Sequence, residues 1–369
     1  MTLTQVGLER LNTATTKKIG TNKNILTNGS CIIAQRGTSS TSSGIHTVDM
    51  YNNFYNGTDE SPTQAQVDVA SGTTPYSSGF RKALKITNGN QTSGAGSNDY
   101  IAIQHGIEAQ NIAQSGWNYT SSSSFVTLSF WIKSSVAQSF KGYLRTSDGT
   151  KQHYPFDTGS LSADTWTKIT KTVSGNSNIQ IDDDNGNGFQ INIVAFWGTD
   201  GTASSVTENA WQAYSDSTRM KDNTSTWYTT NNATLEITGL QLEVGSVATD
   251  FEHRSFGEEL NLCKRYFQVH NENGKFTGNT SYYRSGNIET QFKFEPEMRA
   301  TPSFSAASGT NYYYFYRNNG FDSFNSWGST NAMGQRGGAV NASTSSASNG
   351  TAGAMYVNTG GTLHFSAEL

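Results

Sequence analysis

The sequence contains little cysteine and proline and has no long apolar run. Its 369 residues include 5 Pro and only two cysteines, Cys31 and Cys263, too few for a disulfide framework, so we expect two unpaired, partly buried thiols. No apolar run approaches the roughly 20 residues of a membrane-spanning helix. The first residues also lack the apolar core of a signal peptide, which predicts synthesis and folding in a cytosol-like compartment.

Charged residues are scarce as well. They make up 15% of the chain, and the formal net charge of −4 offers no basic field that could hold a nucleic-acid backbone. A disordered chain would combine low hydrophobicity with high charge and few aromatic residues, whereas 12% of these residues are aromatic. The absences therefore favour a folded protein with no membrane span and no nucleic-acid partner.

Aromatic and turn-forming residues are abundant instead. The chain has 19 Phe, 17 Tyr, 7 Trp and 37 Gly, with many Ser, Thr and Asn residues. Aromatic side chains suit the pleated surface of a strand, and small polar residues suit the turns between strands. Good helix formers are scarce. The composition predicts an all-β protein, and the length allows roughly two domains.

Residues 21–255 read as one β-domain. Segments 125–132, 189–197 and 233–243 alternate apolar and polar residues, as in an antiparallel sandwich with one buried face per sheet. Residues 38–78 do not alternate clearly and are expected to form large surface loops with two edge strands. Residues 1–20 form a weakly helical leader, which is either an anchoring peptide or a frayed terminus.

A helix signal separates this domain from a smaller C-terminal β-domain. Ser255 and Glu258 stand at capping-box spacing, which predicts a short linking helix over 256–263. Residues 264–369 then form the second domain. We expect its strands at 264–270, 278–294, 303–316, 352–357 and 361–366, and a loop at 338–351, where nearly every residue is small or polar.

Four sequence blocks in the first 268 residues carry a family resemblance. They are NG at 28–29 with IAQRG at 33–37, LSFWIKSS at 128–135, GLQLEVG at 239–245 with ATDFEHR at 248–254, and EL at 259–260 with CKRYF at 263–267. These blocks resemble bacteriophage tail-fibre-type virion proteins, which usually have proline where Asp250 stands. The resemblance implies a jelly-roll-like sandwich similar to carbohydrate-binding modules. It also implies a homotrimer on the virion, with the leader contacting other virion proteins and the distal part contacting a host-surface glycan.

A calcium-like motif lies at residues 183–188. The sequence DDNGNG fits the first half of a calcium loop and offers Asp183, Asn185 and Asn187 as ligands of a structural calcium ion. Val194 stands where the loop should end in a bidentate glutamate, so a polar hairpin turn is the other interpretation. No other cofactor is predicted.

The C-terminal domain offers candidates for ligand binding. Alternation places Tyr312, Tyr314 and Tyr316 on one face of a strand and Tyr313 with Phe315 on the other, and Trp327 follows in a loop-like stretch at 321–327. Sugar rings have apolar faces and polar edges, so exposed aromatic rings beside polar groups suit them. The alternative is that these rings form a domain core or a subunit interface.

No catalytic set is evident in the sequence. The six histidines are scattered, and Glu252, His253 and Arg254 are expected to make structural hydrogen bonds at the domain junction. We therefore predict a non-enzymatic phage virion appendage, a tail-fibre or tail-tip subunit that attaches to host-surface glycans. Two alternatives stay open: a capsid decoration or head-fibre protein, and a carbohydrate-binding module without catalysis.

Overall fold

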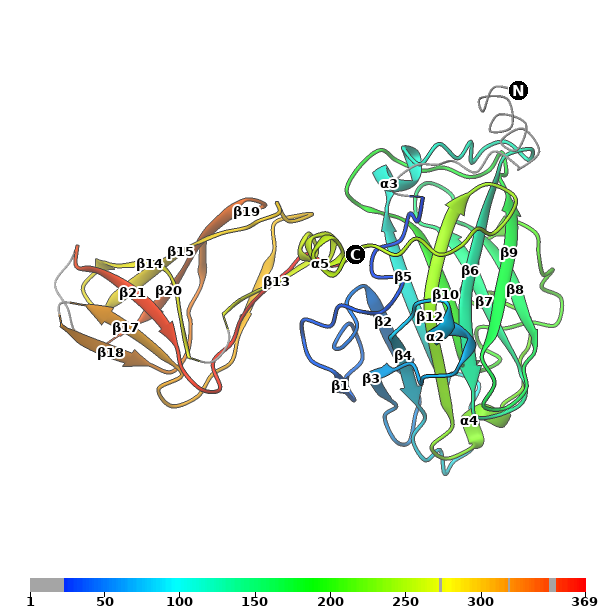
Figure 1. Cartoon of the computed structure of the whole chain (residues 1–369), viewed down its shortest axis with the longest axis horizontal. Helices are drawn as coiled ribbons and strands as arrows, with labels where there is room; N and C mark the ends of the chain where they lie inside the picture. Colours follow the sequence, from blue (N-terminus) through cyan, green and yellow to red (C-terminus); the bar gives the residue numbers. More distant parts are fainter. Residues whose placement is uncertain (1–22, 272–273, 318, 345–349) are drawn as a thin grey trace, which may run out of the picture. The chain divides into compact units, whose positions relative to one another are not determined.

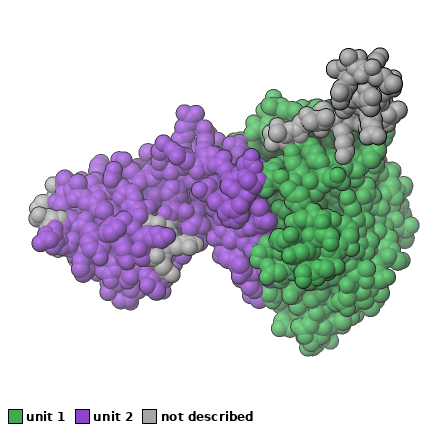
Figure 2. All heavy atoms as spheres, in the orientation of Figure 1, with its two compact units in different colours: residues 1–30, 53–63, 67–254 green, residues 31–52, 64–66, 255–369 purple. Residues whose placement is uncertain are grey.

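The chain folds into two compact units. A computed structural model describes residues 23–271, 274–317, 319–344 and 350–369, so the predicted leader at 1–20 lies outside the described residues. Among the described residues, the first unit comprises residues 23–30, 53–63 and 67–254, and the second comprises 31–52, 64–66 and the described part of 255–369 (Figure 2). Two short segments from the amino-terminal part of the sequence therefore belong to the second unit.

Two sheets form the sandwich. The strands are β2 (Tyr51–Asn56), β3 (Thr63–Asp68), β4 (Lys82–Thr87), β5 (Tyr100–Glu108), β6 (Phe125–Ser134), β7 (Ser139–Thr146), β8 (Gln152–Ser160), β9 (Thr167–Ser174), β10 (Asn187–Trp197), β11 (Gln212–Ala213) and β12 (Thr234–Val244). One sheet has the order β3-β4-β12-β6-β9, and the other β11-β8-β7-β10-β5-β2 (Figure 1). A further strand, β1 (Ser39–Ser40), pairs with residues 64–65 of β3.

Alternating side chains explain why these strands form a sandwich. Strand β6 is antiparallel to both β12 and β9, and its Leu128, Phe130 and Ile132 are fully buried. Strand β10 buries Ile191 and Ile193 in the same way. The three segments predicted as strands from alternation are confirmed as β6, β10 and β12. The all-β prediction is confirmed too, because strands build both units.

Helices in the described residues are short. They are α2 (Thr74–Ser77), α3 (Ala109–Ala113), α4 (Thr226–Thr229) and α5 (Phe256–Lys264). None of these helices is long and apolar enough to cross a membrane.

Glu252 and Arg254 form hydrogen bonds with residues 23–26, at the start of the described chain in the first unit. The Glu252 carboxylate accepts hydrogen bonds from the backbone N–H groups of Lys23 (3.1 Å) and Asn24 (2.9 Å). Arg254 Nη1 donates to the Leu26 carbonyl at 2.9 Å. The structural role predicted for Glu252 and Arg254 is confirmed.

The second unit contains two further sheets. Its strands are β13 (Phe267–Asn271), β14 (Lys275–Arg284), β15 (Asn287–Lys293), β16 (Ser303–Ala306), β17 (Tyr313–Arg317), β18 (Gly320–Phe324), β19 (Thr330–Gly334), β20 (Gly337–Ser343), β21 (Ala352–Val357) and β22 (Leu363–Ser366). One sheet has the order β13-β22-β16 and the other β18-β17-β21-β14-β15-β20-β19. The larger sheet provides the broad surface that carries the candidate site.

Aromatic side chains dominate the core of the second unit. Phe365 of β22 is fully buried, and its ring centroid lies 5.0 Å from that of Phe292, 4.9 Å from Phe294 and 5.1 Å from Phe304. Large rings at these separations fill the space between two sheets with few side chains. The scarcity of aliphatic residues in this part of the sequence is therefore compatible with a packed core.

The loop predicted at 338–351 is wrong over its first part. Residues up to Ser343 belong to β20, which pairs with β15 and β19, and Val340 and Ala342 are fully buried. The small side chains of β20 can pack in the core because the neighbouring strand β15 carries larger ones. For example, Phe292 of β15 lies opposite Gly338. Residues 345–349 lie outside the described residues.

The loop-like stretch at 321–327 also begins as a strand. Residues 321–324 belong to β18, which pairs with β17, and Phe324 is buried. The polar composition of residues 321–324 did not predict a strand. They form one because their backbone pairs with the tyrosine-rich strand β17.

Both cysteines are buried in the second unit, and neither forms a disulfide. Burial raises the pKa of the Cys263 thiol well above its usual range, and the nearby carboxylate of Asp49 acts in the same direction. The thiols predicted from the sequence are confirmed, and they are buried more deeply than expected.

Helix α5 begins with the predicted capping box. The Ser255 hydroxyl accepts a hydrogen bond from the Glu258 N–H at 3.3 Å, and the Glu258 carboxylate accepts one from the Ser255 N–H at 2.9 Å. These bonds satisfy backbone donors that have no partner in the first turn. Phe256 and Leu262 remain exposed, so capping is a large part of what defines this helix.

We expect Ser255→Ala to destabilise α5 by about 1 kcal/mol, because the N-cap acceptor is lost. Hydrogen exchange of the α5 amides would measure this as faster exchange. Ser343→Ala serves as the control, since Ser343 is exposed on β20 outside any helix. Equal exchange in wild type and Ser255→Ala would show that the cap contributes nothing.

Candidate functional site

Strand β17 presents two different faces. Tyr313 and Phe315 are fully buried in the core, whereas Tyr314 is partly exposed and Tyr316 is 37% exposed on the opposite face. Successive side chains of a strand point to opposite sides, which places these two pairs on opposite faces of the sheet. The alternation predicted for this segment is confirmed over residues 313–316.

Neighbouring strands add three more aromatic rings to the outer face. In the register of the sheet, Tyr314 lies opposite Tyr356 of β21, Tyr356 lies opposite Phe276 of β14, and Tyr316 lies opposite Phe321 of β18. Phe276 is 60% exposed and Phe321 is 57% exposed. We call these five side chains, Phe276, Tyr314, Tyr316, Phe321 and Tyr356, the aromatic face.

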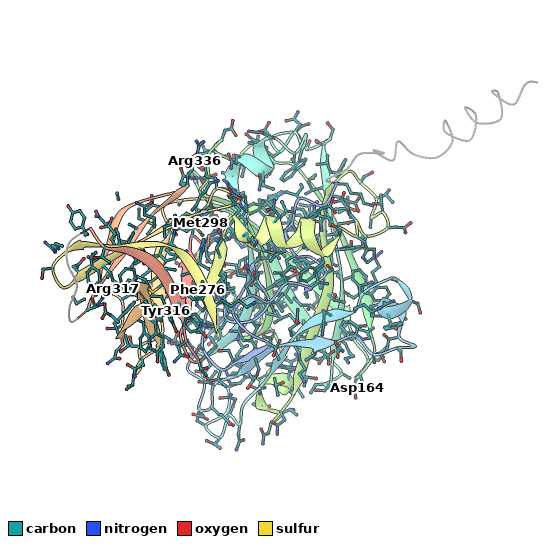
Figure 3. The ribbon with its side chains drawn as sticks, turned by 60° about the vertical axis from the view of Figure 1, so that its left-hand side comes forward. Asp164, Phe276, Met298, Tyr316, Arg317 and Arg336 are labelled. Carbon is teal, nitrogen blue, oxygen red and sulfur yellow. The ribbon has the colours of Figure 1, made fainter. Side chains whose placement is uncertain are left out.

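Tyr316 is the centre of the aromatic face. Its ring centroid lies 5.3 Å from Phe276, 5.7 Å from Tyr356, 6.3 Å from Tyr314 and 5.5 Å from Phe321. Figure 3 labels Phe276 and Tyr316, which lie beside each other on the second unit. The five rings therefore form one continuous surface that spans strands β18, β17, β21 and β14.

The rings of the aromatic face are tilted against one another. The interplanar angle is 85° between Tyr314 and Phe321, 65° between Phe276 and Tyr356, and 44° between Tyr316 and Phe321. Edge-to-face contacts of this kind stabilise neighbouring rings. They also make the surface corrugated, with ring faces and ring edges alternating across it.

Polar groups border the aromatic face. Tyr314, Tyr316 and Tyr356 contribute phenol hydroxyls, and Asn358 Nδ2 lies 3.4 Å from the Tyr314 hydroxyl. These hydroxyl and amide groups can bind the hydroxyls of a ligand whose apolar surface rests on the rings. The Arg317–Asp322 pair lies on the other side of these strands, because Asp322 stands opposite Phe315 in the sheet register and accepts a hydrogen bond from the buried Tyr282 hydroxyl at 2.6 Å.

The Asp322 carboxylate is ionised in this arrangement. Burial alone would raise the pKa of Asp322, but hydrogen bonds from Arg317 and Tyr282 lower it below its usual value overall. The carboxylate accepts hydrogen bonds from Arg317 Nε at 2.7 Å and from Arg317 Nη2 at 3.0 Å, and it neutralises this guanidinium on the core side of the sheet. The pair therefore adds no net charge near the aromatic face.

Trp327 and Tyr312 do not belong to the aromatic face. The Trp327 ring lies 5.5 Å from that of Tyr313 and 5.2 Å from that of Phe324, both of which are core residues. Tyr312 precedes β17 and packs against the same core. Of the predicted ligand-binding residues, the structure brings Tyr314 and Tyr316 together, whereas the partly buried Tyr312 and Trp327 pack against the core.

Sequence reasoning missed Phe276, Phe321 and Tyr356. Phe276 and Tyr356 are 80 positions apart, and only the pairing of β14 with β21 brings them together. Phe321 offered a local signal, since its strand follows β17 after a short turn and pairs with it. A prediction of residues 313–324 as a β-hairpin would have placed Phe321 beside Tyr316.

Two of the three predicted calcium ligands, Asp183 and Asn187, make contacts within the protein. Asp183 Oδ1 accepts a hydrogen bond from Gln114 Nε2 at 3.0 Å, and the adjacent Asp184 accepts one from the Gly186 N–H at 2.8 Å. Asn187 begins β10 and pairs with Glu108 of β5. In the part of the chain that the structure describes, no group of three or more His, Cys, Asp or Glu side chains is arranged for a metal ion.

The first unit has a row of buried amides across the middle of one sheet. Gln104 of β5 donates from Nε2 to the side-chain oxygens of Gln190 (2.8 Å) and Asn192 (3.3 Å) on β10. Gln190 and Asn192 are 5% and 0% exposed. Because these groups are covered, we place the candidate site on the exposed aromatic face.

Comparison with known proteins identifies no family for this chain. No protein-family model and no curated protein matches this chain. Among solved structures, it is similar to the N-terminal cellulose-binding domain of Cellulomonas fimi β-1,4-glucanase C, with 11% identity and a TM-score of 0.28 over 59% of this chain and 99% of that domain. It is also similar to a family 11 carbohydrate-binding module from Clostridium thermocellum, with 10% identity and a TM-score of 0.27 over 58% of this chain and 98% of that module.

A phage protein shows a similar likeness. The enzymatically active domain of tailspike protein 4 from bacteriophage CBA120 has 8% identity and a TM-score of 0.31 over 60% of this chain. This chain spans only 22% of the length of that tailspike chain.

Proposed function

We propose that this protein binds glycans without cleaving them, and that the aromatic face of the second unit is the binding surface. The observation that carries the proposal is the contiguous set of five partly exposed rings on the outer face of a sheet. An exposed apolar patch bordered by polar groups marks an interaction site in a folded protein. Pyranose rings match it, since their C–H faces stack on aromatic rings and their hydroxyls reach polar neighbours.

The charge of the chain favours neutral glycans on this face. The formal net charge is −4, and the five side chains of the aromatic face are all uncharged. A nucleic acid would require a surface of unpaired cations for its phosphates. Phenol hydroxyls and aromatic faces suit uncharged sugars better.

The tilt of the rings favours single glycan chains over flat crystalline surfaces. A crystalline polysaccharide presents a planar array of sugar rings and would need coplanar aromatic partners. Neighbouring rings on the aromatic face instead meet at angles between 44° and 85°. A single chain can turn its successive sugars to match such a corrugated surface.

The place of this protein in a phage particle is part of the proposal. The sequence blocks around residues 28–37, 128–135 and 239–267 resemble tail-fibre-type virion proteins. On that basis we propose a homotrimeric tail-fibre or tail-tip subunit that attaches the virion to host-surface glycans. Gold-labelled antibodies on intact particles would mark the tail, and label on the head would support a capsid decoration instead.

A binding experiment tests the proposed function. The full chain is incubated with soluble cello-oligosaccharides, N-acetylglucosamine oligomers and purified host-envelope glycans, and binding is measured by isothermal titration calorimetry. We expect saturable binding of at least one soluble glycan and none to microcrystalline cellulose. Binding to the crystalline material alone would overturn the single-chain assignment, and absence of all binding would overturn the proposed function.

The same samples test the proposal that the protein is not an enzyme. The glycans are recovered after long incubation and their chain lengths are compared with those before it. We expect unchanged chain lengths. Shortened products that disappear with heat-inactivated protein would show catalysis.

A further inference from the structure

A cleft around His270 lies in the second unit and shares no residue with the aromatic face. It consists of two adjoining cavities of about 340 and 360 Å³, and both are lined by His270 and Lys293. Small-molecule sites begin at about this size. The other lining residues are Thr277, Gly278, Asn279, Gln291 and Phe292 in one cavity, and Lys264, Gln268, Val269 and Glu295 in the other.

Aromatic residues fix the position of the His270 ring. It meets Phe292, Phe294 and Phe365 nearly at right angles, with centroid distances of 5.5, 5.4 and 5.1 Å. These three rings belong to the core of the unit. The imidazole is therefore held in one orientation at the wall of the cleft.

Gln268 determines which nitrogen of His270 carries the proton. The Gln268 amide nitrogen donates to the carbonyls of Lys264 (3.1 Å) and Pro296 (2.9 Å), so its Oε1 is the atom that faces His270. His270 Nε2 lies 3.2 Å from this Oε1, which can only accept. Nε2 must then carry the hydrogen, and Nδ1 is left as a hydrogen-bond acceptor.

The imidazole keeps this form at neutral pH. Burial lowers the pKa of His270 to about 4, and the nearby positive charge of Lys264 acts in the same direction. A neutral imidazole with a protonated Nε2 offers Nδ1 to a ligand that donates, such as a hydroxyl group.

The charges around the cleft favour an anion. Lys264 and Lys293 contribute two positive charges, and Glu295 contributes one negative charge that is paired with Lys293. The ammonium group of Lys264 is left to balance a ligand. The Lys264 ammonium can pair with a carboxylate, and His270 Nδ1 can accept a hydrogen bond from a hydroxyl group. A ligand that uses both contacts therefore has a carboxylate and a hydroxyl group.

We propose that the His270 cleft binds a small polyhydroxylated carboxylate, of the hexuronic-acid class. A hydroxyl group donates to His270 Nδ1, and the carboxylate pairs with Lys264. Asn279, Gln291 and Thr277 provide further hydrogen bonds to the remaining hydroxyls. The site does not depend on the aromatic face, so either assignment can fail without the other.

Nuclear magnetic resonance of the full chain labelled with ¹⁵N-histidine tests the proposal. The His270 signals are assigned by their loss in His270→Gln, and glucuronate is the probe at about pH 7. We expect the free protein to show the tautomer with a protonated Nε2, and glucuronate to shift the His270 signals in a saturable way. No shift at saturating glucuronate, or the opposite tautomer, would overturn the proposal.

Variants and simpler ligands separate the two contacts. Lys264→Gln is expected to weaken glucuronate binding about fivefold, as for a partly exposed ion pair. Lys275→Gln is the matched control, since Lys275 lies in the same unit outside the cleft, and should bind like wild type. Glucose lacks the carboxylate and acetate lacks the hydroxyls, so both should bind more weakly than glucuronate. Equal binding of all three compounds would contradict the paired recognition.

Discussion

Replacing Tyr316 with alanine is expected to weaken glycan binding by roughly 30-fold, which corresponds to about 2 kcal/mol. Tyr316 is the one ring of the aromatic face that contacts the other four. Its removal takes away a stacking surface and leaves a gap in the middle of the patch. Central, well-packed aromatic residues carry most of the energy in binding surfaces.

Tyr283→Ala is the matched control for this prediction. Tyr283 lies on β14 of the same unit and is 67% exposed, yet it is not one of the five rings of the aromatic face. Its loss removes the same chemical group from a more exposed position and should leave glycan affinity unchanged. Isothermal titration with the soluble glycan that binds wild type best gives both affinities.

The outcomes of this pair are distinct. If Tyr316→Ala binds like wild type, the glycan site lies elsewhere in the chain. If both variants lose affinity equally, general surface hydrophobicity and not the aromatic face carries the binding. Since Tyr316 is 37% exposed and its strand remains paired on both sides, we expect the variant to fold and its unfolding temperature to change little.

Local patterns in the sequence were enough to predict part of this structure. Alternation identified β6, β10 and β12, and it placed Tyr314 and Tyr316 on the face opposite Phe315. The Ser255–Glu258 spacing identified α5. In each case the determining interactions lie within a few residues or within one strand, where periodicity and capping act.

Features that depend on distant pairing could not be predicted in this way. Strand β20 is made of small residues and becomes a strand because β15 and β19 pair with it. Phe276 joins the aromatic face through Tyr356, far along the chain. Trp327 looked like a ligand-binding residue because its sequence neighbours are polar, but it packs against Phe324 and Tyr313. A single sequence does not reveal which strands become neighbours.

The packing of residues 31–52 into the second unit creates a buried ion network that no local pattern indicated. Arg36 Nη2 donates to Glu368 Oε1 at 2.7 Å, and Arg36 Nη1 lies 3.7 Å from Asp49 Oδ1. Gln35 Nε2 donates to Asp49 Oδ2 at 2.6 Å. The Arg36 guanidinium also lies 3.4 Å from the centroid of the Phe267 ring. Arg36 thus contacts two buried carboxylates that are distant in the sequence, and the charge of Arg299 makes a smaller favourable contribution at Glu368.

Arg36→Gln is expected to destabilise the second unit by about 3–5 kcal/mol near neutral pH, because it leaves Asp49 and Glu368 buried without their cation. Burial raises the pKa of both carboxyls, although the charge of Arg36 opposes the rise. Glutamine keeps much of the volume and some hydrogen-bonding capacity. The loss of stability is therefore assigned mainly to charge.

The effect of Arg36→Gln should become smaller in acid. A carboxyl whose pKa is higher in the folded state than in the unfolded state favours folding while it is protonated, and this contribution is lost as the pH rises through the folded pKa. Without Arg36 both carboxyls have still higher pKa values, so the penalty is large near pH 7 and declines as the pH falls toward the unfolded values of about 4. Urea unfolding of wild type and Arg36→Gln at each pH measures the difference in their free energies of unfolding. The unfolding of the second unit is monitored by hydrogen exchange of the amides in β22.

Adding Glu368→Gln to the Arg36→Gln variant separates charge from packing. If uncompensated negative charge causes the loss, the double variant should regain part of the stability at about pH 7 and show a weaker pH dependence. If the double variant is instead less stable than the single one by the full cost of a second buried substitution, packing and not charge dominates. Recovery specific to neutral pH would show that Arg36 stabilises the second unit by balancing the charge of two buried acids.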